Sequence, residues 1–245
     1  MVFTDSFFFS AIIPETEFFL SQEESHHLGH VLRLKVGQEI MVTDGMGKLS
    51  YCRIFEIDKK GIVRLLPLNV KTVPQESPVI TVAMGFLRKQ NFETAAEMVA
   101  QLPVAKIQPF FSDRTQVIKD SVPGMVRRLE DKLKVALKQS KQCWLTEILK
   151  PVSFADVLKS ACESSYGCLF EKCEESGLAV DFPNLAAAEN IFLIIGPEGG
   201  FSEEELKEVK NKKLRIHRLG NTRLRAELAA PVAVSAILTA KGIFL

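Results

Sequence analysis

The spacing of apolar and polar residues changes near residue 78 and divides the chain into two regions. Between residues 38 and 68, short runs rich in β-branched and aromatic residues alternate with the turn sequences Asp44–Gly47 and Asp58–Gly61. This pattern is typical of short β-strands joined by tight turns. One stretch with helical character, Glu23–Leu34, precedes them. We therefore expect the first region to be a small β-barrel with one helix.

The segment Val70–Pro78 contains two prolines and few large apolar residues, so we place a domain boundary there, with domains at residues 1–72 and 73–245. Beyond it, strand-like and helix-like stretches alternate. This alternation predicts an α/β domain with a parallel sheet covered by helices on both faces. Ligands of such sheets bind at the carboxyl ends of the strands. The expected strands are Val79–Leu87, Val104–Phe111, Tyr166–Glu171, Ile191–Gly196 and Leu214–Gly220, and the expected helices are Asn91–Leu102, Val126–Lys141, Phe154–Cys162, Glu203–Asn211 and Ala226–Lys241.

Composition narrows the functional classes. A net charge of +1 gives the whole chain no attraction to nucleic acid or to a membrane surface. The five cysteines contain no CxxC pair, and the four histidines do not alternate with them at zinc-ligand spacing. The N-terminus lacks a basic start, and no uncharged run is long enough to span a bilayer. We expect a reduced cytoplasmic protein that holds no metal and contacts no membrane.

The stretch IFLIIGPEGGFSEEEL, residues 191–206, joins a strand to a helix through a glycine-rich loop. Glycine permits positive φ angles and close backbone approach. Ser202 and Glu205 form an S-x-x-E capping box that begins the helix at Glu203. The acidic first turn repels a polyphosphate, and neither GxGxxG nor a P-loop is present. The loop is either a structural turn or a site for a ligand without net negative charge, such as S-adenosylmethionine.

A second strand-to-helix turn, Leu219–Ala230, follows a locally basic stretch. Between Leu206 and Arg225 there are eight basic residues and a single acidic one, Glu208. Such a stretch is either a solvated face or a surface for a polyanion such as RNA. The last helix is small and apolar on every face, which predicts that the sheet or a second subunit covers it. We expect a homodimer contact there.

The GPEGG block followed by LG-x-x-x-LR-x-E-x-A resembles the RsmE family of 16S rRNA methyltransferases, which belong to the SPOUT class. The stretches HHLGHVLRLKVGQEI, KIQPFFSDRTQV and, more weakly, ALKQSKQ carry further likeness, so the resemblance covers most of the chain. It implies a trefoil-knotted α/β domain with a PUA-like N-terminal barrel. It also implies methyl transfer from S-adenosylmethionine to N3 of a uridine, position 1498 of 16S RNA.

The resemblance also implies which residues form the site. Contacts to S-adenosylmethionine are expected from apolar walls and backbone groups, and RNA contacts from basic residues of both domains. The expected cofactor residues are Leu169, Phe170, Ile195, Gly196, Pro197, Glu198, Gly200, Leu219, Gly220 and Leu224. The positions of basic side chains, apart from the resemblance, give the expected RNA-binding residues Arg33, Lys35, Arg114 and Arg223.

The chemistry requires that uracil N3 lose its proton before it becomes a good nucleophile. The site therefore needs a base, or a cation that stabilises the anion shared by O2 and O4. Arg225 is the candidate cation. Glu227 or Glu198 either accepts the proton or holds Arg225 in place, and the sequence does not decide between them. The sulfonium of the donor needs no metal.

The chain departs from the family pattern at several positions. Thr222 stands where the family has an arginine, Arg223 follows where an aliphatic residue is usual, and Leu228 replaces a threonine. The Glu-Gln-Ser-x-Arg segment reads Lys138–Gln142, and residues 95–104 lack the usual Glu-Leu-Gly-Val. We expect Arg223 to supply the missing guanidinium.

Three alternatives to a 16S rRNA uridine N3-methyltransferase follow. The first is a SPOUT methyltransferase for another RNA nucleotide. The second is a non-catalytic RNA-binding or ribosome-assembly protein, favoured by the departures from the family pattern. The third, a hydrolase that uses Ser202, lacks the G-x-S-x-G elbow, and a helix cap explains that serine better.

Overall fold

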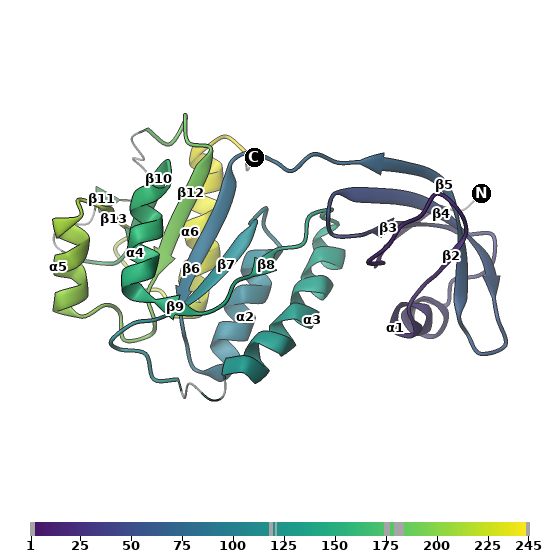
Figure 1. Cartoon of the computed structure of the whole chain (residues 1–245), viewed down its shortest axis with the longest axis horizontal. Coiled ribbons are helices and arrows are strands. Elements are labelled where there is room, and N and C mark those ends of the chain that lie inside the picture. The colour runs from purple at the N-terminus through teal and green to yellow at the C-terminus, as the bar shows by residue number, and fades with distance from the viewer. Residues whose placement is uncertain (1–2, 118–119, 121, 174–176, 179–183, 244–245) are drawn as a thin grey trace. The chain divides into compact units, whose positions relative to one another are not determined.

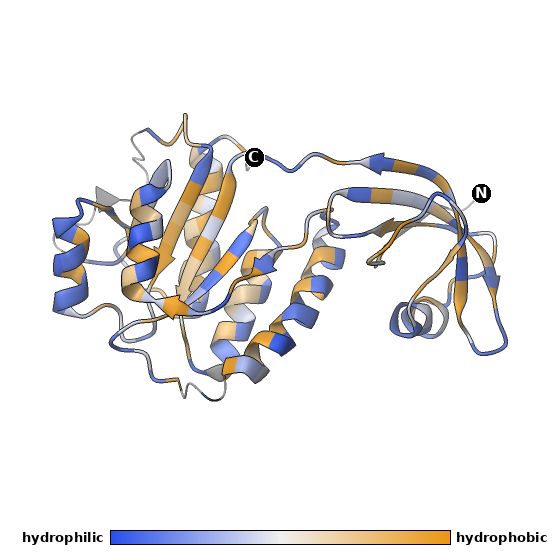
Figure 2. Cartoon of the chain, viewed as in Figure 1, coloured by the Kyte–Doolittle hydropathy of each residue, from blue (hydrophilic) through white to orange (hydrophobic). Residues whose placement is uncertain are grey.

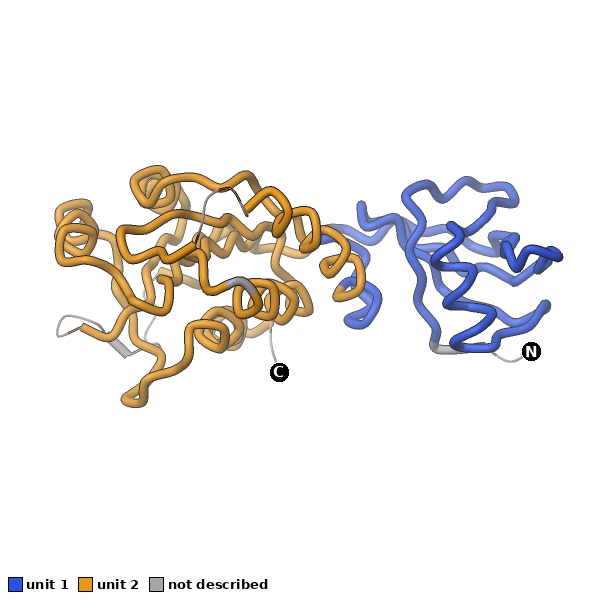
Figure 3. Tube along the Cα trace, turned by 90° about the horizontal axis from the view of Figure 1, so that it is seen from below, with its two compact units in different colours: residues 1–75, 137–145 blue, residues 76–136, 146–245 orange. Residues whose placement is uncertain are grey.

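The computed structural model describes residues 3–117, 120, 122–173, 177–178 and 184–243. The chain divides into two compact units (Figure 3). The first consists of residues 1–75 and 137–145, and the second consists of residues 76–136 and 146–245. Each unit is described separately below.

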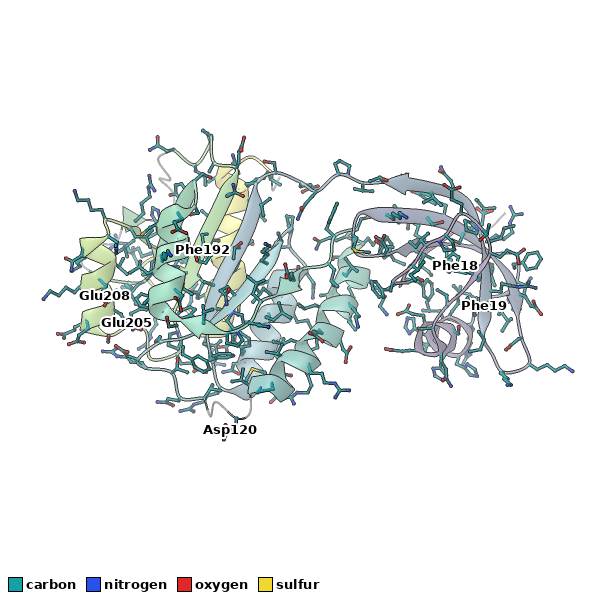
Figure 4. The ribbon with its side chains drawn as sticks, in the orientation of Figure 1. Phe18, Phe19, Asp120, Phe192, Glu205 and Glu208 are labelled. Carbon is teal, nitrogen blue, oxygen red and sulfur yellow. The ribbon has the colours of Figure 1, made fainter. Side chains whose placement is uncertain are left out.

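The first unit is built on a five-stranded sheet. Its strands are β1 (Phe3–Phe9), β2 (Phe18–Phe19), β3 (Glu39–Thr43), β4 (Lys48–Ile57) and β5 (Val63–Thr72), in the order β1-β3-β4-β5-β2. β1 pairs with β3 in parallel, and the other pairs are antiparallel. Side chains alternate across this sheet, so Phe18 is buried and its neighbour Phe19 is 62% exposed (Figure 4).

The helix of the first unit is shorter than its sequence predicts. It comprises α1 (Gln22–His26), which Ser21 caps by accepting the backbone N–H of Glu24, and the π-helical turn η1 (His27–Val31). The helix ends because Arg33 adopts a φ of 54°, outside the helical region. The predicted linker also begins later than expected, since β5 continues to Thr72.

Residues 137–145 belong to the first unit although they are distant from it in sequence. The Lys138 ammonium pairs with the buried Glu24 carboxylate, and Trp144 donates its indole N–H to the carbonyl of Val73 at 3.0 Å. A division at residue 72 leaves this segment out. That residues 1–72 form a domain by themselves stays a prediction.

The second unit contains an eight-stranded parallel sheet, which confirms the predicted α/β class. Its strand order is β11-β13-β10-β12-β6-β7-β8, with β9 paired to β7. The strands are β6 (Val79–Gly85), β7 (Lys106–Phe111), β8 (Glu147–Ile148), β9 (Val152–Ser153), β10 (Tyr166–Phe170), β11 (Gly177–Leu178), β12 (Asn190–Ile195) and β13 (Arg215–Arg218). The helices are α2 (Lys89–Ala100), α3 (Val122–Ser140), α4 (Phe154–Glu163), α5 (Glu203–Asn211) and α6 (Ala226–Ala240).

Helices cover both faces of this sheet (Figure 1). On one face, α4 and residues of α5 pack against Ala83, Leu169 and Ile194 in an apolar cluster. On the other face, α6 packs against α2, β6 and β12. The strands between them are strongly apolar, whereas α5 is largely hydrophilic (Figure 2). This arrangement explains why β10 is buried along its whole length.

The sheet and α2 cover one side of α6, which agrees with the first of the two predicted covers, and cover of the other side by a second subunit stays a prediction. Ala230, Ala233, Val234, Ile237 and Leu238 are buried, but Leu228 is 44% exposed. Only one side of the helix is buried within this chain, because the sheet and α2 pack against that side alone. Among the described residues, no helix combines the length and the apolar character needed to cross a membrane.

The thiols should differ sharply in reactivity. Burial raises the pKa of Cys52 to about 11 and also raises the pKa of Cys168, so both stay protonated and poorly nucleophilic at pH 8. Cys162 is exposed. We expect iodoacetamide to label Cys162 in the folded protein and to label Cys52 and Cys168 only after unfolding in urea, as measured by peptide mass spectrometry. Equal labelling rates at Cys162 and Cys168 in the folded protein would contradict this prediction.

Candidate functional site

The carboxyl ends of the central strands lie at one level of the sheet. Ile195, the last residue of β12, pairs with Phe170 of β10 on one side and with Met84 of β6 on the other. Phe170 in turn pairs with His217 of β13. The loops that follow these strands therefore gather at one edge, as the strand alternation predicts.

A cavity of about 140 Å³ lies among three of these loops. It is lined by residues that follow β10, β12 and β13 and by the first turns of α6. Its lining residues are Phe170, Glu171, Lys172, Ile195, Gly196, Glu198, Gly200, Arg218, Leu219, Gly220, Thr222, Arg223, Leu224, Ala226 and Ala229. We call it the small pocket.

Eight of the ten residues predicted to bind the cofactor line the small pocket. The exceptions are Leu169 and Pro197. Leu169 is fully buried in the apolar cluster beneath α4, because side chains alternate along β10 and Phe170 takes the other face. Pro197 is buried against the backbone of Gly85. The structure therefore places these two side chains beside the site rather than in it.

The GPEGG loop is held in a tight turn. Gly200 has a φ of 68°, and its N–H donates to the carbonyl of Pro197 at 2.9 Å. A side chain at Gly200 would be strained at this angle, which explains the glycine. The predicted capping box is confirmed, since Ser202 accepts the N–H of Glu205 and Glu205 accepts the N–H of Ser202.

A larger cleft of about 610 Å³ adjoins the small pocket and shares four lining residues with it, Glu198, Arg223, Leu224 and Ala226. Its full lining is Arg88, Asn91, Arg114, Gln116, Glu198, Gly199, Arg223, Leu224, Arg225, Ala226 and Glu227. Four of these are arginines and two are glutamates. The cleft thus carries a local positive charge that the chain as a whole lacks.

The larger cleft brings together all three predicted catalytic residues, Arg225, Glu227 and Glu198, with the predicted RNA-binding residues Arg114 and Arg223. The other two, Arg33 and Lys35, are exposed residues of the first unit. Their contact with RNA stays a prediction.

Glu198 is engaged by the backbone of a neighbouring loop. Its carboxylate accepts the N–H of Arg88 at 3.1 Å and the side-chain amide of Asn91 at 3.2 Å. Arg88 is the N-cap residue of α2, whose own side chain makes no capping bond. The carboxylate therefore stabilises the positive end of that helix and ties the GPEGG loop to it.

Arg225 and Glu227 lie at the start of α6. The Arg225 guanidinium is 88% exposed and lies 3.9 Å from the Glu227 carboxylate, which is 20% exposed. An ion pair this long and open contributes little to stability. The Arg225 side chain is therefore available to a ligand, with Glu227 beside it as a shielded acceptor.

A hydrogen-bond network positions the loop after β7. Ser202 donates its hydroxyl to Asp113 at 2.6 Å, and Asp113 donates its backbone N–H to the buried carboxylate of Glu205 at 3.0 Å. Arg114 then donates to the carbonyl of Gly199 at 2.9 Å. Figure 4 marks Glu205 at the start of α5, where it meets this loop, and Glu208 further along the helix. These contacts place the Arg114 side chain in the larger cleft.

Ten lining residues were not among the predicted site residues, and the six of these with charged or amide side chains are Arg88, Asn91, Gln116, Glu171, Lys172 and Arg218. A signal for most of them was present. The rule that ligands bind at carboxyl ends applies to every strand of a parallel sheet, and these residues follow or end β6, β7, β10 and β13. No group of three or more potential metal ligands occurs among the described residues.

The fold and the two cavities define an α/β protein with a ligand site at the carboxyl ends of its parallel strands. A family model described as RNA methyltransferase domain matches residues 75–238, and another described as RNA methyltransferase PUA domain matches residues 20–66. The chain therefore belongs to the RNA methyltransferase family, and its N-terminal region is PUA-like.

Named relatives agree with this membership. Ribosomal RNA small subunit methyltransferase E of Rickettsia conorii is 28% identical over 219 residues, which cover 89% of this chain and 87% of the relative. The protein of the same name from Synechocystis is 28% identical and covers 92% of this chain and 74% of the relative.

Solved structures agree as well. A Legionella pneumophila methyltransferase in complex with S-adenosylmethionine has a TM-score of 0.84 and 27% identity, covering 96% of this chain and 97% of that one. Ribosomal RNA small subunit methyltransferase E of Neisseria gonorrhoeae, also bound to S-adenosylmethionine, has a TM-score of 0.85 and 23% identity, covering 96% and 98%. The latter likeness supports the fold.

Replacing Glu198 tests its role in holding the loop. We expect Glu198→Ala to lower the free energy of unfolding by about 1 kcal/mol, since loss of a helix cap costs roughly 0.5–2 kcal/mol. Urea unfolding would measure it. The exposed Glu204→Ala should change stability by less than about 0.5 kcal/mol. Equal stability of the two variants would show that the Glu198 contacts do not hold the loop.

Replacing Ser202 tests the network at α5. Ser202→Ala removes the acceptor for the Glu205 N–H and the donor to Asp113, so we expect a loss of about 1–2 kcal/mol in unfolding free energy. Ser202→Thr keeps the hydroxyl and should recover most of it. The hypothesis of a hydrolase nucleophile would instead predict a native-like stability for Ser202→Ala.

Proposed function

We propose that this chain transfers a methyl group from S-adenosylmethionine to N3 of a uridine in 16S rRNA, at the position equivalent to 1498. One observation carries the proposal: a small pocket with apolar walls opens beside an arginine-lined cleft, and Glu198, Arg223, Leu224 and Ala226 belong to both. This is the arrangement needed by an enzyme that joins a methyl donor to an anionic polymer.

The residues of the small pocket fit S-adenosylmethionine. Phe170, Ile195 and Leu219 offer apolar surface to the adenine ring. Gly220 has a φ of 143° with no atom within 4 Å of the position a β-carbon would take, so its backbone is open to the pocket. The buried Nε of Arg218 finds no acceptor among the described residues and is available to the donor's carboxylate.

The first turn of α5 supports the same choice of ligand. Glu203 and Glu204 are exposed there and would repel a polyphosphate. When bound, the donor supplies a methyl group already activated by its sulfonium charge. The protein's part is to align the uracil with it and to remove the N3 proton.

We assign these tasks to residues of the larger cleft. Arg225 stabilises the negative charge that spreads over O2 and O4 as the N3 proton leaves. Glu227, beside Arg225, accepts that proton. Glu198 holds the loop against α2 and takes no proton, because its carboxylate already accepts the Arg88 N–H and the Asn91 amide.

The basic side chains position the RNA. Arg114 and Arg223 in the cleft, with the unassigned Arg88, suit phosphates that flank an unstacked nucleotide. Arg223 supplies the guanidinium that the family carries at the position of Thr222, since it lines both cavities. Arg33 and Lys35 of the PUA-like unit extend the contact to neighbouring RNA. A 16S rRNA substrate implies a cytoplasmic enzyme.

The trefoil knot and the homodimer are part of the proposal. Residues of the segment 219–224, which follows β13, line the small pocket together with the ends of β10 and β12, and α6 then packs on α2. The knot itself is inferred from the resemblance to the RsmE family. The exposed side of α6, with Leu228, suits the same helix of a second copy. A crystal structure traced through residues 190–245 would test the knot, and light scattering the dimer.

Methylation of purified RNA tests the function. The protein with S-adenosylmethionine should form N3-methyluridine in 16S rRNA or small subunits that lack it, detected by mass spectrometry of a nuclease digest. Arg225→Ala should lower kcat by about 100-fold or more, as loss of a charge-stabilising donor does. Lys207→Ala, an exposed residue of α5, is the matched control. Methylation of a different nucleotide would favour the alternative SPOUT activity, and no transfer to any RNA would favour a non-catalytic role.

A further inference from the structure

Glu171 is held at the rim of the small pocket by the strand pairing. It directly follows β10, and its N–H donates to the carbonyl of His217 in β13 at 2.9 Å. The residue is half-buried and lines the small pocket. Its backbone is therefore fixed, and its side chain extends from a rigid strand end rather than from a loose loop.

The carboxylate of Glu171 faces the GPEGG loop. One oxygen, Oε1, accepts the backbone N–H of Lys172 at 2.9 Å. The other, Oε2, lies 3.0 Å from the point that a β-carbon on Gly200 would occupy. Among the described residues, Oε2 has no hydrogen-bond donor. It is an acceptor in the pocket wall that the protein leaves open.

Glu171 forms no ion pair among the described residues, although Arg218 and Arg223 line the same pocket. Lys172 donates its ammonium to the carbonyl of Asn221 at 2.6 Å and so holds the loop after β13. Glu198, the other acidic residue of the small pocket, is engaged by the start of α2. Glu171 is thus the carboxylate of this pocket that is available to a ligand.

A carboxylate at a strand end is well suited to bind the ribose of a nucleoside. An ionised carboxylate only accepts hydrogen bonds, and each of the two vicinal hydroxyls of a ribose can donate one to it. An acidic side chain plays this part for ribose in dinucleotide-binding sheets. A carboxylate also attracts a cationic ligand and disfavours a phosphorylated one.

We propose that Glu171 binds the ribose hydroxyls of the methyl donor and so selects a ribonucleoside donor for the small pocket. This rests on the proposed function, in which that pocket holds S-adenosylmethionine. Glu171 determines donor specificity and takes no part in proton transfer.

Calorimetry with S-adenosylhomocysteine, which cannot react, and with its 2′-deoxy and 3′-deoxy analogues tests the assignment. Glu171→Ala should weaken binding of S-adenosylhomocysteine by about 10- to 100-fold, the usual effect of one charge-assisted hydrogen bond. At least one deoxy analogue should bind the natural protein more weakly by a similar factor, yet bind Glu171→Ala no more weakly than S-adenosylhomocysteine does. Glu171→Gln keeps an acceptor for Lys172 and should show an intermediate loss.

The exposed Glu204→Ala is the matched control and should bind all ligands as the natural protein does, with thermal unfolding confirming that each variant is folded. If removal of a ribose hydroxyl weakens ligand binding by the same factor in the natural protein and in Glu171→Ala, Glu171 does not bind that hydroxyl. That result would overturn the role of Glu171 and leave the proposed function standing. Failure of the natural protein to bind S-adenosylhomocysteine or S-adenosylmethionine at millimolar concentration would instead overturn the proposed function, and this assignment with it.

Discussion

The parallel pairing of β12 with β10 and β6 is the constraint on which the site depends. It places Ile195 beside both Phe170 and Met84, so that the segments that follow these three strands leave the sheet at one level. A shift of β12 by one residue would exchange the faces of Leu193 and Ile194. It would also move Gly196 away from the ends of its neighbours. The small pocket exists only in the observed register.

Charged side chains hold the loops at this edge, and they do so mainly by binding backbone groups. Glu198 accepts the N–H of Arg88, Glu205 accepts the N–H of Asp113, and Lys172 donates to the carbonyl of Asn221. Each contact joins loops from two different strands. Other charged side chains of the two cavities, among them Arg225 and Glu171, stay open to a ligand. Charged residues of the same types thus hold the loops in place at some positions and are available to bind a ligand at others.

How far the sequence predicts the structure depends on the range of the interactions involved. The strand Lys48–Ile57, the start of α5 at Glu203 and the helix beginning at Ala226 were predictable because their patterns are local. The strand Phe3–Phe9 was not, since its partner is β3 and only that pairing distinguishes it from an apolar leader. Likewise, the helix Val122–Ser140 reads as one element, although its end belongs to the first unit through Lys138 and Glu24. A single Arg88 after a strand carries no pattern at all until the strand order is known.

The basic residues between Leu206 and Arg225 lie in different places in the structure, so their number alone does not predict which of them line the cavities. Lys207, Lys212 and Lys213 are exposed on α5 or just after it, away from both cavities, and Arg215 stacks on Tyr166 at 4.8 Å. Of the described residues that line the larger cleft, four are arginines and none is a lysine. Arginine presents a planar fork that matches phosphate and stacks on bases, and it is less strongly hydrated than lysine. Under the proposed function, the cleft would therefore bind RNA through the geometry of a few guanidinium groups rather than through the lysines of α5.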